Sequence, residues 1–311
     1  VRNSKSCNGI GLHTGVESTI TFHPAPEDYG IRFKRSDIKN SPEIKADINH
    51  VVDISRGTTI EEKNVRIHTV EHALAAVTGL QIDNVLIELN SKEPPVMDGS
   101  AKDFVDALLD AGPIFQNKKR KVLEIDRAVN YTDYYRDIDI HVIPSDRFRV
   151  TFLVDYPLPA LGTQYEAIYN MEEDFAVEVA PARTFCFLSE VEMLREQGLI
   201  KGGSLDNALV IVDKEIDKNE IERLRHLFGI EEDIIHGVNG VLNGKVLRFK
   251  NEPVRHKTLD LIGDLALLGF PIKGHVTAAR AGHASNVEFV KKLKKEYSEE
   301  LDKLRNGDID G

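Results

Sequence analysis

The chain has 311 residues, of which 41% are hydrophobic and 29% charged, the composition of an ordinary folded protein that is long enough to bury a sizeable core. Its formal net charge of −11 argues against a nucleic-acid-binding protein, and no apolar run approaches the length of a membrane-spanning helix. With no visible signal peptide and only Cys7 and Cys186, we expect a reducing, cytoplasmic compartment, in which any metal is held by histidine and carboxylate.

Short strands followed by a helix–strand–helix unit are predicted for the N-terminal third. "STITFHP", "GIRFKRS" and "TTIEEKNVRIHT" alternate apolar and polar residues, with "EEKN" as a hairpin turn. The helix "TVEHALAAVTGL" follows, with Thr69 as its expected N-cap. A strand, "IDNVLIEL", then leads to the helix "SAKDFVDALLDAG", capped by Ser100 and ended by Gly112. The polar, basic segment 115–121 is expected to link two domains.

An amphipathic helix with an unusual polar face is predicted at residues 254–270. Leucines recur at helical spacing and Gly269 marks the stop, but His256, Asp260 and Asp264 fall on one line at i, i+4 and i+8. Such a stripe is either the solvated side of the helix or part of a metal site that needs a further ligand from elsewhere. The strand "IKGHVTAA", the turn "RAGHA" and the helix "SNVEFVKKLKKE" follow.

The two halves share a pattern that favours an internal duplication. Residues 100–108 and 285–293 match in type at every anchoring position, each beginning with serine. His72 lies 28 residues before the first of these serines and His256 lies 29 before the second. Because a serine capping signal is common, chance is the alternative, but the spacing favours a repeated β–α–β–α unit. Two such units packed face to face would bring the two histidine-bearing helices together.

A metal site follows from this pairing. Glu71 and His72 open the helix "TVEHALAA", where a histidine prefers to be neutral and can bind a metal. With His256 and Asp260, His72 forms a set of two imidazoles and one carboxylate, typical of a catalytic zinc that leaves a fourth position open for water. Glu71 is then placed to accept the proton of that water. The alternative is a glutamate that satisfies the helix dipole beside an incidental histidine.

A second histidine is a candidate for acid or oxyanion chemistry. Asp264 lies one turn beyond Asp260, too far for a comfortable ligand, and suits the orientation of His283 in the turn "RAGHASN". Held by Asp264, a protonated His283 could stabilise an oxyanion or donate a proton to a leaving amine. The alternative is an exposed loop histidine. Lys257, next to a ligand, is a further candidate for binding negative charge.

Seven motifs occur in one order across nearly the whole chain: "GIGLHTG", "TVEHALAA", "PVMDGSA", "ARTF", "KGGSLDNA", "RHKTLDLIGDL" and "AGHASN". Together they resemble the UDP-3-O-acyl-N-acetylglucosamine deacetylases, zinc amidases that commit a sugar nucleotide to lipid A biosynthesis. The resemblance implies an α+β fold of two similar domains, each a β-sheet with helices packed on one face, in the ribosomal S5 domain 2-like class. It also implies that the helical layers are sandwiched between the two sheets. We place the domains at 1–114 and 122–311, with 115–121 as the linker.

The resemblance also implies roles for individual residues. It implies one Zn²⁺ per chain on His72, His256 and Asp260, with Glu71 as general base. His283 becomes the cationic partner, supported by Asp264. Further active-site residues are Thr184, which helps to hold the oxyanion, and Lys257.

An inserted element at residues 183–212 is implied to form a hydrophobic passage for the acyl chain of the substrate. The residues in the matching positions are Phe185, Phe187, Val191, Leu199, Ile200, Gly203 and Ser204. From the residues alone this segment reads as an amphipathic helix capped by Ser189 and Glu192. Arg280 stands where some family members carry a lysine and could meet a phosphate.

The implied substrate is a UDP-linked acylated amino sugar. Some relatives continue into a fused dehydratase domain, so this chain could be one half of a larger polypeptide. Residues 217–237 have no assigned role. Two alternatives stay open: a zinc amidase for another N-acyl sugar or peptide, and a non-catalytic nucleotide-binding module in which the histidines and aspartates are structural.

Overall fold

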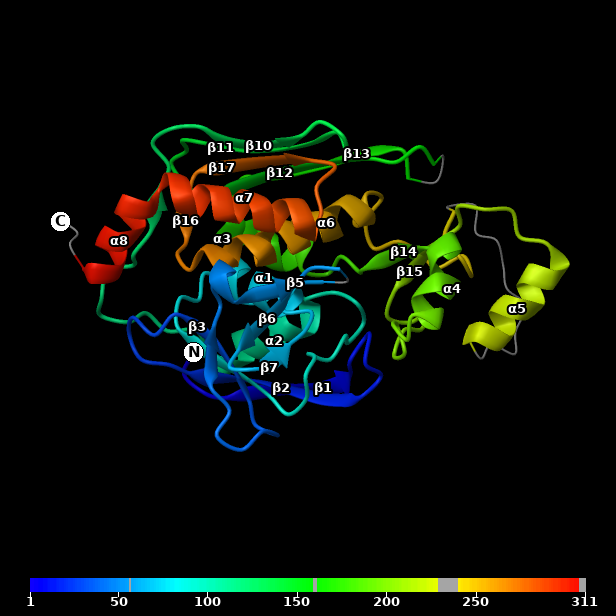
Figure 1. Cartoon of the computed structure of the whole chain (residues 1–311), viewed down its shortest axis with the longest axis horizontal. Coiled ribbons are helices and arrows are strands. Elements are labelled where there is room, and N and C mark those ends of the chain that lie inside the picture. The colour runs from blue at the N-terminus through cyan, green and yellow to red at the C-terminus, as the bar shows by residue number, and fades with distance from the viewer. Residues whose placement is uncertain (56, 159–160, 229–239, 308–311) are drawn as a thin grey trace.

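Two five-stranded sheets enclose a layer of helices in the computed structural model, which describes residues 1–55, 57–158, 161–228 and 240–307 (Figure 1). The first sheet has the order β1-β2-β8-β3-β4 and is built from β1 (Lys5–Ile10), β2 (Glu17–Pro24), β3 (Ile31–Arg35), β4 (Glu43–Lys45) and β8 (Val85–Leu89). The second has the order β10-β11-β17-β12-β13 and is built from β10 (Val129–Asp133), β11 (Ile138–Ile143), β12 (Arg149–Asp155), β13 (Thr163–Ile168) and β17 (His275–Ala279).

The two sheets share one topology. In each sheet the central strand is antiparallel to the strand on one side and parallel to the strand on the other. A helix precedes and another follows that strand: α1 (Glu71–Gly79) and α2 (Lys102–Ala111) flank β8, whereas α6 (Glu252–Leu265) and α7 (His283–Glu296) flank β17. This correspondence is what an internal duplication produces, and common ancestry of the halves stays a prediction.

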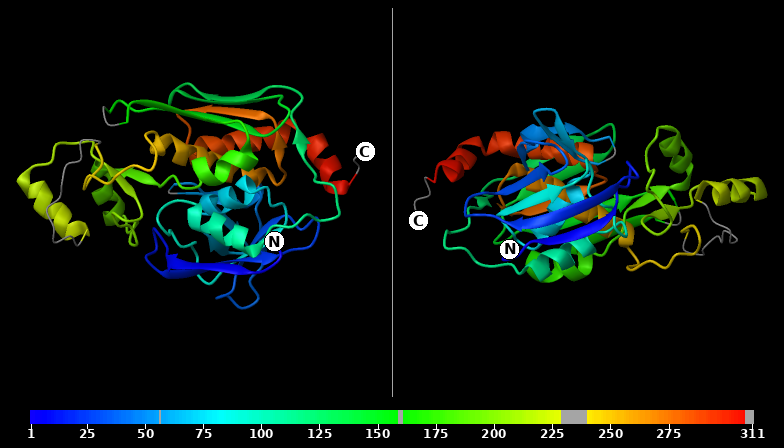
Figure 2. Two further views of the ribbon diagram at one scale, coloured as in Figure 1. Left: turned by 180° about the vertical axis from the view of Figure 1, so that it is seen from behind. Right: turned by 90° about the horizontal axis from the view of Figure 1, so that it is seen from below.

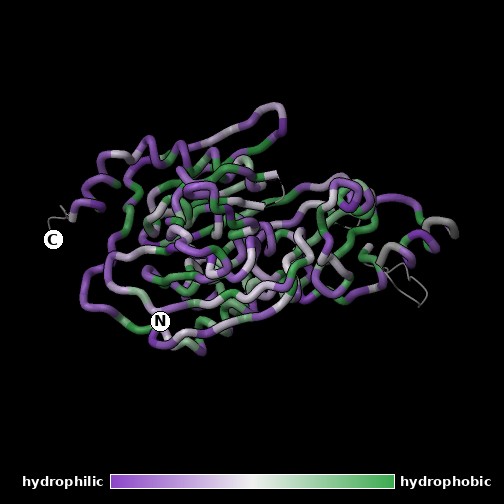
Figure 3. The backbone as a smooth tube through the Cα atoms, turned by 60° about the horizontal axis from the view of Figure 1, so that its bottom comes forward, coloured by the Kyte–Doolittle hydropathy of each residue, from purple (hydrophilic) through white to green (hydrophobic). Residues whose placement is uncertain are grey.

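The helices face inward because each sheet has one apolar face. In β2, for example, alternate residues are buried, as the period-2 pattern of the sequence predicts. Hydrophobic segments run through the middle of the body (Figure 3). At the centre, α1 and α6 approach so closely that a Cβ atom built on Gly263 would lie 2.2 Å from the carbonyl oxygen of Glu71. Only glycine fits there, and this close approach brings the two histidine-bearing helices together.

Smaller elements surround this body. A three-stranded sheet contains β5 (Val51–Asp53), β6 (Thr59–Glu62) and β7 (Val65–Ile67), and β9 (Leu123–Glu124) pairs with β16 (Ile272–Lys273). Further helical segments are η1 (Ile48–His50), α3 (Met171–Asp174), the π-helical η2 (Phe175–Val179), η3 (Ala266–Leu268) and α8 (Ser298–Asn306). None of the helices in the described ranges is long and apolar enough to cross a membrane.

A parallel β–α–β unit lies in the range where the insertion is expected. It consists of β14 (Phe185–Phe187), α4 (Leu188–Glu196) and β15 (Leu209–Ile211). Together with α5 (Lys218–Phe228) it projects from one end of the two-sheet body (Figure 2). Residues 229–237 of the segment without an assigned role lie outside the described residues.

Several expected helix ends are wrong. Thr69 is not an N-cap, because α1 begins at Glu71 and the Thr69 hydroxyl donates to Glu93. Ser100 precedes the N-cap of α2 by one residue, although its hydroxyl accepts the N–H of Lys102. Ser189 lies inside α4, as Glu192 does, and bonds to Asp213 instead of capping the helix.

The C-terminal unit also differs in detail from its prediction. The expected strand at residues 272–279 is divided into β16 and β17 at Gly274. His283 is the first residue of α7 and does not lie in a loop. Gly269, in contrast, ends the helical segment in the left-handed conformation, as expected.

Candidate metal centre

Three buried side chains form a metal-binding geometry between the two central helices. His72 comes from the first turn of α1, and His256 and Asp260 lie one turn apart in α6. One ligand atom from each residue lies within 4.8 Å of the others. The Asp260 Oδ1 atom is 3.7 Å from Nε2 of His72 and 3.5 Å from Nε2 of His256. The polar stripe of α6 is therefore not its solvated side.

The charges of this triad suit a divalent cation. Burial lowers the pKa of His72 to about 3, assisted by the neighbouring His256, and burial also lowers the pKa of His256. Burial opposes ionisation of Asp260, but Lys257 and the histidines outweigh it and hold the pKa of Asp260 well below its usual range. Two neutral imidazoles and one carboxylate are the ligand set expected of a zinc site with an open position.

The contacts of the triad leave its ligand atoms facing one another. Lys257 Nζ donates to Asp260 Oδ2 over 2.9 Å, so that Oδ1 faces the histidines. The Nδ1 atom of His256 is 3.0 Å from the carbonyl oxygen of Ala182, which can only accept a hydrogen bond. The proton of the neutral ring is therefore on Nδ1, and the lone pair of Nε2 points towards Asp260. This is the arrangement in which an outer contact orients a ligating histidine.

Glu71 is a buried carboxylate beside the triad. Its Oε2 atom accepts the N–H of Thr58 over 2.9 Å, and its Oε1 atom lies 3.9 Å from Nε2 of His283. Burial raises the pKa of Glu71 to about 7, although the nearby His283 opposes this shift. A carboxylate with a pKa near neutrality can both accept and release a proton at physiological pH.

His283 lies beside both Glu71 and the triad, with its Nε2 atom 3.9 Å from Oδ2 of Asp260, and it is held by Asp264. Asp264 is fully buried and accepts hydrogen bonds from Nδ1 of His283 (2.8 Å), the hydroxyl of Thr58 (2.6 Å) and the amide of Asn286 (2.9 Å). Burial opposes the imidazolium, but Asp264 and Asp260 outweigh it and raise the pKa of His283 to about 10. His283 is therefore a cation at neutral pH.

Sequence reasoning missed Thr58 and gave no role to Asn286. Thr58 contacts both Glu71 and Asp264, and 206 positions separate it from Asp264, so no local pattern could have revealed the link. Asn286 was within reach of prediction, because it lies on the same helical face as the first residue of α7 and belongs to the motif "AGHASN".

The aromatic residues expected in the passage lie near the triad. The ring centroid of Phe185 is 6.5 Å from that of His256, and Lys257 Nζ lies 5.8 Å from the centre of the Phe185 ring. Phe187 and Tyr156 pack against Phe185 in edge-to-face geometry. The main-chain N–H of Thr184 donates to the carbonyl of Gly99, and within the described residues no hydrogen bond joins Thr184 to the triad.

The other passage candidates lie in the projecting unit. Val191 belongs to a small apolar core, and Ile200 packs against it. Leu199, Gly203 and Ser204 belong to the turn that follows α4. Arg280 is not brought to the triad, because its guanidinium pairs with Asp137 at 3.0 Å.

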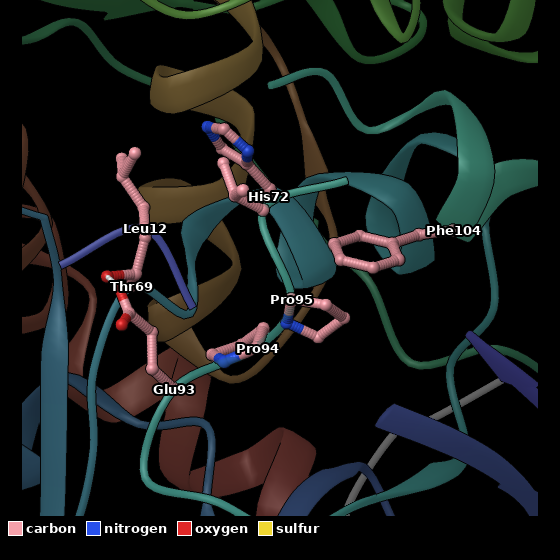
Figure 4. Close-up of a pocket in the computed structure, with 8 residues that line it drawn as sticks. Leu12, Thr69, His72, Glu93, Pro94, Pro95 and Phe104 are labelled. Carbon is pink, nitrogen blue, oxygen red and sulfur yellow. Dashed lines mark hydrogen bonds between the residues drawn. The ribbon is translucent and has the colours of Figure 1, made fainter. Parts of the chain in front are cut away.

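A small cavity adjoins His72 (Figure 4). Glu93 lines it, is fully buried, and accepts the main-chain N–H groups of His13 and Thr14 as well as the hydroxyl of Thr69. The remaining lining residues are Leu12, Pro94, Pro95, Val96 and Phe104. Glu93 thus holds the loop after β1 close to the start of α1, another contact that sequence reasoning missed.

Comparison with known proteins gives a consistent result. Residues 1–228 and 228–295 match the family described as UDP-3-O-acyl N-acetylglycosamine deacetylase. A relative from Chlorobaculum tepidum, named bifunctional enzyme LpxC/FabZ, is 53% identical over 95% of this chain and 63% of its own length. Two relatives named UDP-3-O-acyl-N-acetylglucosamine deacetylase are each 41% identical to this chain. The match to the protein of Syntrophotalea carbinolica covers 92% of this chain and 84% of the relative's length. The match to that of Thermodesulfovibrio yellowstonii covers 94% of this chain and 90% of the relative's length. The chain spans less than two thirds of the bifunctional relatives that it matches.

Proposed function

Since this chain belongs to the UDP-3-O-acyl N-acetylglycosamine deacetylase family, we propose that it removes the N-acetyl group of a UDP-3-O-acyl-N-acetylglucosamine by zinc-dependent hydrolysis. The products are acetate and a free amine, and the reaction is a step of lipid A biosynthesis in the cytoplasm. The observation that carries the proposal is the buried triad of His72, His256 and Asp260, with Glu71 and His283 next to it and within 3.9 Å of each other.

The residues of the triad fit zinc. Held by His72, His256 and Asp260, a Zn²⁺ ion would supply a Lewis acid and lower the pKa of water at its open position. Because Lys257 already occupies one oxygen of Asp260, this carboxylate would bind through its other oxygen. The Ala182 carbonyl would keep the His256 ring in the tautomer that binds a metal.

Glu71 and His283 divide the proton transfers in this proposal. Glu71 accepts the proton of the attacking water, for which it must be ionised. His283, kept charged by Asp264, stabilises the oxyanion that develops on the acetyl carbonyl and then supplies the proton that the leaving amine needs. Thr184 is a second group for the oxyanion, and Lys257 a cation for the substrate.

The projecting β–α–β unit supplies the proposed acyl-binding surface. Phe185 and Phe187 belong to β14 of that unit, and Phe185 lies beside His256 of the triad. The surface is proposed to continue through Val191, Leu199, Ile200, Gly203 and Ser204. Arg280 stays a candidate for a phosphate contact, which requires it to leave the exposed Asp137. We also keep the domains at 1–114 and 122–311, and the name LpxC/FabZ of the similar proteins supports a second, fused enzyme, expected to be a dehydratase.

Substrate comparison tests this function. The purified chain is incubated with UDP-linked N-acetylglucosamine that carries a long acyl chain, a short one or none, and separately with an N-acetylated peptide, and free amine is measured. The proposal expects turnover that rises with the length of the acyl chain. Equal turnover of the three, or turnover only of an N-acetylated peptide, would favour a zinc amidase of other specificity. If the purified chain contains no zinc and turns over none of these substrates, a nucleotide-binding module would be favoured.

A further inference from the structure

The peptide unit between Ala182 and Arg183 is held at both ends by α6. Its carbonyl oxygen is bonded to Nδ1 of His256 at 3.0 Å, and its N–H donates to Oε1 of Glu252 at 3.1 Å. Glu252 and His256 are four residues apart in α6 and therefore lie one turn apart on the same face. Two side chains of one helix thus form hydrogen bonds with both polar groups of this peptide unit.

Glu252 is a buried charge with a full set of partners. It has no exposed surface, and Arg183 is only 5% exposed. The Arg183 side chain donates from Nε at 2.7 Å and from Nη2 at 3.0 Å, one bond to each carboxylate oxygen. The N–H of Arg248 adds a bond at 2.7 Å. A buried ion pair is weak evidence for stability, since burying both charges costs about as much as their attraction returns, so a positional role is the better explanation.

Peptide geometry connects this pair to the metal centre. A trans peptide unit is planar, so its N–H and C=O groups point in opposite directions. When Glu252 fixes the direction of the N–H, it also fixes the carbonyl of Ala182. That carbonyl determines which nitrogen of His256 carries the proton and how the ring is turned.

We propose that Glu252 and Arg183 are positioning residues for the metal ligand His256, acting through the Ala182–Arg183 peptide unit. This inference rests on the proposed function only in taking His72, His256 and Asp260 as ligands. Within the described residues, no hydrogen bond or ion pair joins Glu252 or the Arg183 side chain to His72, to Asp260 or to the His256 ring. Its effect is to keep Nε2 of His256 unprotonated and directed at the metal position.

The test compares Glu252→Gln with a matched control, Glu166→Gln. Each change removes the carboxylate charge of a glutamate–arginine ion pair that involves α6: Glu252 with Arg183, and Glu166 with Arg255. Glu166 also accepts from Asn251, but its bonds reach none of the three proposed metal ligands. Binding of Zn²⁺ alone is measured by competition with a chromogenic chelator. We expect Glu252→Gln to weaken Zn²⁺ binding by about 10- to 100-fold, the usual effect of losing an outer contact, and the control to keep the affinity of the unaltered chain.

A second measurement separates positioning from general destabilisation. In the metal-free protein, ¹⁵N NMR of His256 is expected to show the Nδ1–H tautomer, and Glu252→Gln to show a mixture. If Glu252→Gln does not fold, Arg183→Lys takes its place, because it keeps the charge but loses the planar fork. Unchanged Zn²⁺ affinity and an unchanged tautomer would overturn the inference, as would equal weakening in the control. If the unaltered chain binds no Zn²⁺, the ligand assignment fails, and the tautomer measurement still decides the role of Glu252.

Discussion

Replacement of Asp264 by Asn tests the proposed division of proton transfer between Glu71 and His283. Asp264 is fully buried, and its Oδ2 atom lies 2.8 Å from Nδ1 of His283. Asparagine keeps the shape but removes the negative charge, and its single oxygen can accept either from Thr58 or from His283, not from both. The imidazolium of His283 then loses the strongest interaction that favours it, whereas the burial that opposes it remains.

The size of the effect follows from Coulomb's law. Two unit charges about 4 Å apart interact by about 4 kcal/mol at an effective dielectric constant of about 20, which corresponds to about 3 pKa units. Shifts measured for such pairs are about 1–3 units. The pKa of His283, raised to about 10 in the unaltered protein, should therefore fall by about 1–3 units.

The assay is the pH dependence of kcat/KM. In the proposed mechanism His283 acts as a cation, so activity should be lost as the pH rises through its pKa, and a lower pKa should move this alkaline limb to lower pH. The acid limb should move the same way by less, because Asp264 also raises the pKa of Glu71. His283→Gln is the control and should remove the alkaline limb with zinc still bound. An alkaline limb that stays in place in Asp264→Asn would refute the reasoning and point to Lys257.

Four further outcomes are expected. Alanine at any one of His72, His256 and Asp260 should abolish both activity and bound zinc, because three ligands leave no redundancy. Zinc is measured by elemental analysis, and full zinc occupancy would contradict the assignment. Glu71→Ala should keep its zinc and lose about 10²- to 10⁴-fold in kcat, whereas lost zinc would make Glu71 a ligand. Because burial raises the pKa of Glu71 to about 7, its ionisation destabilises the metal-free fold as the pH rises through that value. The Tm of metal-free Glu71→Gln should therefore exceed that of the metal-free unaltered chain at pH 8 but not at pH 5. The same Tm difference between the two proteins at both pH values would contradict this. Gly263→Ala should lose about 1–3 kcal/mol in denaturant unfolding, since its methyl group would push α1 from α6; unchanged stability would show that the helices can separate freely.

Much of the candidate metal centre could be predicted from the sequence because its residues obey helical spacing. His256 and Asp260 are one turn apart, and the repeated pattern pointed to His72 as the partner from the other half. The strands were predictable for the same reason, since burial on one face imposes alternation. These patterns record local geometry, which a sequence carries directly.

The contacts that hold the site together could not be predicted, because they join distant segments or involve the main chain. Thr58 reaches Asp264 across 206 positions, and the Ala182 carbonyl, which orients His256, has no side-chain signature. The expected cap at Thr69 failed because Glu93 captures its hydroxyl while the backbone of Thr69 adopts a positive φ of 54°. Tertiary contacts outweighed local preference there.

The most direct test of the central claim measures acetate release and zinc content in the same samples. The purified chain is treated with a chelator, assayed with UDP-3-O-acyl-N-acetylglucosamine, and assayed again after Zn²⁺ is restored, beside His256→Ala. The account predicts that acetate release disappears with the zinc, returns in proportion to the zinc restored, and never returns in the variant. Full acetate release from the zinc-free chain, or from His256→Ala, would contradict it.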